Sequence, residues 1–167
     1  MSNAQWRTPN PVNEPVLPYA PGSPERAALQ QTVQKMSAEH IEIPLEIGGK
    51  EVRTGRTGKA TKPHAHRHEL ATFHMGGAAE VEAAAKAAAK AYPAWSTTPW
   101  ADRAAIFLKA AELLAGPWRQ RLNGSTMVGQ SKNPFQAEID AACEMIDFWR
   151  FNVRFMEEIY AEQPLST

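Results

Sequence analysis

The chain of 167 residues has a single cysteine, Cys143. One cysteine excludes an internal disulfide framework and any zinc site built from several thiolates. Cys143 could be a nucleophile or a buried thiol. It lies among Glu138, Asp140, Glu144 and Asp147, and neighbouring negative charge raises a thiol pKa instead of lowering it. We therefore expect a buried structural thiol and no catalytic residue in this chain.

Long apolar runs and an excess of one charge are also missing. No stretch of about 18 apolar residues occurs, so no membrane-spanning helix is expected. The first residues lack both the apolar core of a signal peptide and the arginine-rich pattern of a transit peptide, which favours a cytoplasmic protein. Lys plus Arg and Asp plus Glu number 18 each. This balance gives no basic surface for nucleic acid or an anionic membrane.

Glycine and histidine are too sparsely arranged to form a known ligand motif. The pairs Gly48–Gly49 and Gly76–Gly77 lack the third glycine of a dinucleotide-binding loop, so no cofactor-binding residue is predicted. His64, His66 and His68 would share one face of a strand, where they could hold a metal. The alternative is a solvated turn. No carboxylate pattern accompanies the histidines, so no metal ligand is predicted.

Proline is plentiful at the N-terminus. Six prolines between Pro9 and Pro24 predict an extended arm over residues 1–24 that lies on another surface, the alternative being a disordered tail. Ser23 has the character of an N-cap, and Pro24 suits the first turn of a helix that reaches about Met36.

The next segment predicts strands and then a helix. Apolar residues alternate from Ile41 to Ile47, which predicts one strand with one buried face, and Gly48–Gly49 predicts a hairpin turn. Residues 69–76 could form another strand. The alanine-rich segment 79–92 predicts a helix that ends at Pro93.

Two further helices follow. Thr98 is expected to cap a helix that continues to Gly116, with Ile106 and Leu113 on its buried stripe. The segment 118–130 is helical in pattern but interrupted by Asn123–Gly124.

A long final helix is predicted from about Asn133 to Ala161. Its apolar stripe includes Cys143. Its other face carries Glu144 with Phe148 and Phe151 one and two turns further on. A carboxylate beside aromatic rings could bind an ammonium group, so these three residues are candidate substrate-binding residues. A solvated surface glutamate is the alternative.

Two stretches resemble a known family. "DRAAIFLKAAELLAGPWR" and "TMVGQSKNPFQAEIDAACEMIDFWRFN" are similar to the aldehyde dehydrogenase superfamily, and more narrowly to the delta-1-pyrroline-5-carboxylate dehydrogenases. The resemblance implies an α/β enzyme with a Rossmann-like NAD domain, a catalytic domain and an oligomerisation flap. It implies NAD-dependent oxidation of L-glutamate 5-semialdehyde to L-glutamate, the second step of proline breakdown. Homo-oligomers and a functional coupling to proline dehydrogenase are the implied partners.

The resemblance also assigns this chain a limited part of that enzyme. Family members are much longer, and their nucleophile motif, NAD-binding segments and flap would follow Thr167. We therefore expect an inactive N-terminal fragment of a bacterial, cytoplasmic enzyme. It would be mostly α-helical, with a few N-terminal β-strands and the extended arm. Residues 25–167 would be an incomplete cofactor-binding domain. Glu144 matches a family glutamate near the substrate's α-amino group. A standalone helical protein-interaction module is the alternative function.

Overall fold

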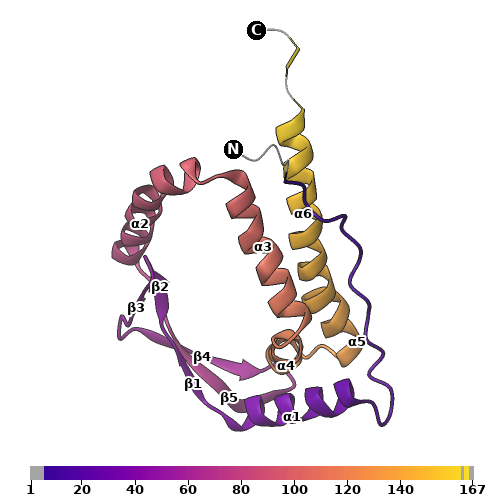
Figure 1. Ribbon diagram of the computed structural model, residues 1–167. Helices are drawn as coiled ribbons and strands as arrows, with labels where there is room; N and C mark the ends of the chain where they lie inside the picture. Colours follow the sequence, from indigo (N-terminus) through magenta and orange to yellow (C-terminus); the bar gives the residue numbers. More distant parts are fainter. Residues whose placement is uncertain (1–5, 163, 166–167) are drawn as a thin grey trace.

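The computed structural model describes residues 6–162 and 164–165, and helices dominate it (Figure 1). This confirms the expected mostly helical fold with a few strands near the N-terminus. The helices are α1 (Pro24–Ala38), α2 (Ala78–Thr97), α3 (Trp100–Ala115), α4 (Arg119–Gln130), α5 (Pro134–Ala137), the π-helical turn η1 (Glu138–Cys143) and α6 (Glu144–Ala161). The strands are β1 (Ile41–Ile43), β2 (Leu45–Ile47), β3 (Lys50–Val52), β4 (Thr57–Lys62) and β5 (Ala65–His74).

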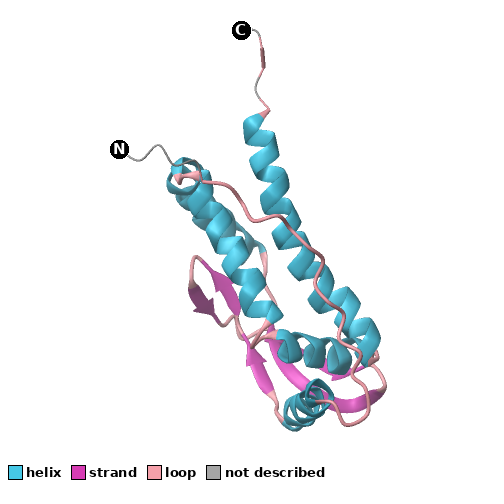
Figure 2. Ribbon diagram, turned by 45° about the vertical axis from the view of Figure 1, so that its right-hand side comes forward, coloured by secondary structure: helices cyan, strands magenta, loops and turns pink. Residues whose placement is uncertain are grey.

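The segment before α1 is extended and runs along α6 (Figures 1 and 2). Near its start, the Thr8 amide donates a 2.8 Å hydrogen bond to a carboxylate oxygen of Glu157. The prolines account for the extended backbone, because each removes a donor and disfavours helix in the preceding residue. A turn at residues 20–23 leads into α1, where the Ser23 hydroxyl accepts a hydrogen bond from the Arg26 amide, as an N-cap should.

Two small sheets occupy the region between α1 and α2. In one, β5 pairs with β1 in parallel and with β4 in antiparallel orientation, and in the other β2 and β3 form a hairpin. The hairpin turn at Gly48–Gly49 is confirmed, with both φ angles positive. The single strand predicted from Ile41 to Ile47 is wrong. Pro44 lacks an N–H for a sheet ladder and divides it into β1 and β2, and Ile41 is 51% exposed.

The alanine-rich helix is longer than predicted. α2 continues through Pro93 to Thr97, because an internal proline removes one backbone hydrogen bond and later residues still form theirs. Thr98 therefore ends α2 and does not cap α3, whose N-cap is Pro99. The predicted stripe of α3 is also displaced, since Ile106 is exposed.

The core lies where α3, α4 and α6 meet. Ala111, Leu114 and Ile146 form its buried cluster. α4 is continuous, so the predicted interruption at Asn123–Gly124 is wrong. Gly124 is needed for packing, because a Cβ atom there would lie 3.0 Å from the Thr32 side chain of α1. Among the described residues, no helix is long and apolar enough to cross a membrane.

Candidate functional site

The final helical segment contains a π-helical turn that places two side chains on the same face. Residues five apart in an α-helix point about 140° away from each other. In η1 the Glu144 amide bonds the Ile139 carbonyl, five residues back, so Glu138 and Cys143 lie nearly above one another. The Cys143 sulfur lies 3.8 Å from a Glu138 carboxylate oxygen. The sequence predicted a single helix here, and the π turn was not foreseen.

The Glu138 carboxylate is completely buried and accepts hydrogen bonds from several elements. Its donors are the Leu17 amide at 2.8 Å, the Tyr19 hydroxyl at 2.8 Å, the Asn123 side-chain amide at 2.7 Å and the Arg119 guanidinium. Arg119, 4% exposed, also binds Glu14 and donates to the Pro15 carbonyl at 2.7 Å. We call the set Glu14, Tyr19, Arg119, Asn123 and Glu138 the buried network.

Opposite charges in the buried network stabilise one another. Burial acts to raise the pKa of Glu138, but hydrogen bonds from Arg119, Leu17 and Tyr19 outweigh it and lower that pKa. Burial acts to lower the pKa of Arg119, but hydrogen bonds to Glu138 and Glu14 outweigh it and raise that pKa. Burial and the bond to Glu138 raise the pKa of Tyr19 to about 12. Glu138 is therefore an anion and Arg119 a cation at neutral pH.

Cys143 is a buried thiol, as predicted. Burial, followed by the charge of Glu138, raises its pKa to about 11, although Arg119 acts in the opposite direction. A thiol of this kind is a poor nucleophile near neutral pH. The geometry therefore supports a structural role for Cys143.

The buried network fastens the N-terminal arm to the helices. The amide of Glu14 donates to Asp147 at 2.7 Å, and the Glu14 carboxylate binds Arg150 as well as Arg119. Its charged groups are paired with one another and with Arg150, so none is left to act as an acid, base or nucleophile. The sequence reasoning missed this cluster. Its one clue was Glu138, which lies two turns before the buried Ile146 on the same helical segment.

The candidate substrate-binding residues lie on the face of the final helix that is turned away from the buried core residue Ile146. Glu144 is the first residue of α6 and is exposed, and Phe148 is exposed as well. Phe151 is half-buried, with its ring centroid 6.2 Å from that of Phe155. Spacings of four and three residues place the three on one helical face. Their role in substrate binding stays a prediction.

Two of the three histidines have separate partners. A ring nitrogen of His64 is 2.7 Å from the Ser131 hydroxyl, and one of His68 is 2.8 Å from the Ser37 carbonyl. No group of three metal-ligating side chains occurs among the described residues.

The glycine pair before α2 does not suit a dinucleotide phosphate. The Glu80 carboxylate accepts a 2.7 Å hydrogen bond from the Gly77 amide, so an anion of the protein already occupies this helix N-terminus. A phosphate there would meet that negative charge. The residues of this chain therefore do not provide an NAD site at this position.

Comparisons with known proteins show which family and which enzymes the chain is similar to. A family model described as "Aldehyde dehydrogenase family" matches residues 50–166. The delta-1-pyrroline-5-carboxylate dehydrogenase of Agaricus bisporus is 51% identical over 162 residues, which are 96% of this chain and 30% of that protein.

Solved structures of similar proteins superpose on the chain. The Delta-pyrroline-5-carboxylate dehydrogenase from Mycobacterium tuberculosis, bound with NAD and cobalamin, superposes with a TM-score of 0.96 at 44% identity, covering 100% of this chain and 32% of that one. Proline utilization A from Bdellovibrio bacteriovorus superposes at 0.83 and 26% identity, covering 88% of this chain and 15% of its own.

These findings confirm the resemblance to delta-1-pyrroline-5-carboxylate dehydrogenases. The chain spans about a third of the length of the Agaricus and Mycobacterium relatives. The Mycobacterium structure superposes on the whole chain, so the shared fold includes the arm and the long final helix. The family model alone covers more than half of the residues. This chain belongs to the aldehyde dehydrogenase family.

Proposed function

We propose that this chain forms the N-terminal part of an NAD-dependent dehydrogenase that oxidises L-glutamate 5-semialdehyde to L-glutamate, in the second step of proline breakdown. The observation that supports this most is the superposition of the entire chain on a delta-1-pyrroline-5-carboxylate dehydrogenase bound with NAD. In this proposal, residues 25–167 are an incomplete cofactor-binding domain, and residues 1–24 are an arm that braces it.

In this reaction the chain would bind and orient the substrate. NAD would accept hydride from the substrate, and its binding groups would come from the longer part of the enzyme. Glu144 lies exposed at the start of α6. Its carboxylate would accept a charge-assisted hydrogen bond from the α-ammonium group. Phe148 and Phe151, on the same face, would form an apolar wall beside the substrate's carbon chain.

Assembly and location complete the proposal. A homo-oligomer is expected for the complete enzyme. The likeness to proline utilization A supports a coupling to proline dehydrogenase. A cytoplasmic location in a bacterium stays a prediction. The chain alone is expected to produce no NADH, since its one cysteine, Cys143, is a buried thiol whose pKa is raised to about 11.

The test uses a full-length chimera, in which this chain replaces the matching third of the Agaricus bisporus dehydrogenase. Glu144→Ala should raise KM for the semialdehyde by roughly 10- to 100-fold, because a hydrogen bond to a charged group contributes about 1.5–3 kcal/mol. KM for propionaldehyde, which has no amino group, should stay the same. Glu158→Ala, an exposed glutamate on the same helix, is the matched control. Equal losses with both aldehydes would contradict the proposed role of Glu144.

A further inference from the structure

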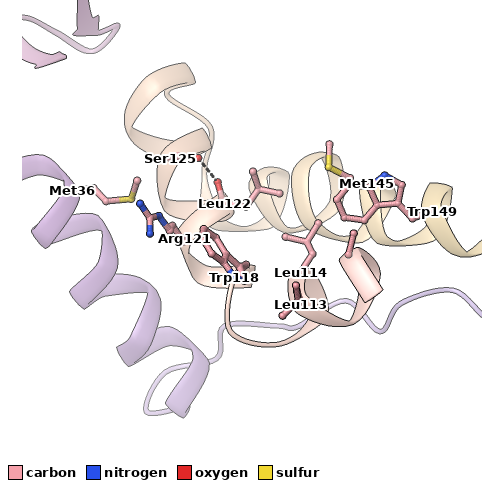
Figure 3. A pocket seen from close by; sticks show the side chains of 10 residues that line it. Met36, Leu113, Leu114, Trp118, Arg121, Leu122, Ser125, Met145 and Trp149 are labelled. Atoms are coloured by element: carbon pink, nitrogen blue, oxygen red, sulfur yellow. Dashed lines mark hydrogen bonds between the residues drawn. The ribbon is translucent and has the colours of Figure 1, made fainter. Parts of the chain in front are cut away.

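An apolar groove opens on the side of the core where α3, α4 and α6 meet. The groove encloses about 420 Å³. Figure 3 shows the side chains that line it. Leu114 belongs both to the buried core cluster and to the groove wall, so the groove is a direct extension of the core. The lining residues are Met36, Ala110, Leu113, Leu114, Trp118, Arg121, Leu122, Ser125, Met145 and Trp149.

Large apolar side chains in this groove are open to solvent. Trp118 is 50% exposed, Met145 is 43% exposed and Leu113 is 41% exposed. They come from three different helical regions, so they form a continuous patch and not a single protruding residue. Patches of this kind on a folded surface mark places where another polypeptide binds. The arm does not cover it, because the arm lies along α6 on the side of the buried network.

The groove has one charged side chain. Arg121 is the only charged residue in its lining, and its guanidinium lies 5.0 Å from the ring centroid of Trp118. None of the ion pairs formed by the described residues includes Arg121. An occupant that fits would therefore be apolar over most of its contact surface, with a carboxylate or the carbonyl end of a helix near Arg121.

The lengths of the relatives indicate where such an occupant comes from. The Mycobacterium structure superposes on this whole chain and still contains about two thirds of its polypeptide elsewhere. We propose that the groove binds an apolar segment of that remaining polypeptide, with an acidic group or a helix C-terminus facing Arg121. This rests on the proposed function, in which the chain is part of a longer enzyme. The segment would complete the core that Ala111, Leu114 and Ile146 begin.

The first test is hydroxyl-radical footprinting of the full-length chimera. The oxidation rates of Trp118 and Met145 in the folded protein are compared with those in denaturant. We expect both side chains to be protected many-fold, as strongly as the buried Ile146. If the groove stays open, half-exposed side chains should show only weak protection, and that result would overturn the proposal. Because the readout is protection and not NADH formation, it is independent of the proposed activity.

The second test separates the groove from exposed apolar residues elsewhere. In the chimera, Leu113→Asp should lower the melting temperature much more than Phe107→Asp. Phe107 lies on the same helix outside the groove and is 42% exposed in this chain, close to the 41% of Leu113, so a solvent-facing groove predicts equal losses. Protection of Trp118 should also be independent of protein concentration. Protection that disappears on dilution would assign the groove to a second copy of the chain and refute the proposal.

Discussion

Replacing Glu138 by glutamine tests how strongly the buried network stabilises the fold. The carboxylate is completely buried and has donors on all sides: the Leu17 amide, the Tyr19 hydroxyl, the Asn123 amide and Arg119. Glutamine has nearly the same shape, but one acceptor oxygen becomes an NH₂ group. In either orientation that group faces a donor at 2.8 Å or less. Arg119 would keep only Glu14 as a charged partner.

The size of the stability loss follows from the burial of the Glu138–Arg119 ion pair. Removing one partner of a buried ion pair costs roughly 3–5 kcal/mol, because the other charge stays buried without full compensation. Native domains are stable by about 5–15 kcal/mol, so Glu138→Gln should remove a large share of the free energy of unfolding. At about 2–4 °C per kcal/mol, the melting temperature should fall by roughly 6–20 °C.

Urea unfolding of the chain, followed by the fluorescence of its five tryptophans, measures the effect. The matched control is Glu112→Gln, which removes an exposed partner of Lys109 and should change stability by less than about 1 kcal/mol. The lowered pKa of Glu138 adds a pH dependence. The contribution of Glu138 to the free energy of unfolding is present above the unfolded pKa of about 4.3 and is lost as pH falls below it. The difference in free energy of unfolding between wild type and variant should therefore become smaller in acid. Equal effects of the two substitutions near neutral pH would refute the reasoning.

Three further outcomes are expected. Cys143, with a pKa of about 11, should react with iodoacetamide at pH 8 only after unfolding, and a fast reaction of the folded chain would contradict its burial. Gly124→Ala should destabilise the chain by about 1–3 kcal/mol, because its Cβ would press on α1. The control Gly129→Ala has open space around it and should be neutral or stabilising by up to about 1 kcal/mol, so equal melting temperatures for the two variants would disprove the close approach. The pKa of Tyr19 is about 12 in the folded chain and about 10 in the unfolded chain, so the stability that Tyr19 contributes should be lost as pH rises from 10 to 12. In Tyr19→Phe, circular dichroism should show that this part of the loss of stability at alkaline pH is absent.

Local chemistry made some elements predictable. The Ser23 cap and the Gly48–Gly49 turn depend on a few adjacent residues, and both appear as predicted. Pro93 and Asn123–Gly124 were misjudged as breaks for a shared reason. A proline or glycine weakens a helix by a limited amount, and the surrounding hydrogen bonds and packing exceed it. Gly124 is required where α4 approaches α1, which no local pattern can reveal.

The candidate site was also predictable only in part. The helical spacing of Glu144, Phe148 and Phe151 was readable from the sequence, and they do lie on one face. The partners of Glu138 are up to 121 residues away in sequence, so no window of neighbouring residues could have identified them. The π turn at residues 138–143, which brings Glu138 and Cys143 onto one face, was not foreseen from the local sequence either.

The contacts of the arm set an order of events during synthesis. Thr8 leaves the ribosome early but binds Glu157, 149 residues later. At about 5–20 residues per second, the arm waits roughly 7–30 s for its partner. Until then the Glu14 carboxylate and the arginines of α4 and α6 must remain hydrated, and the arm takes its place only when α6 has been made.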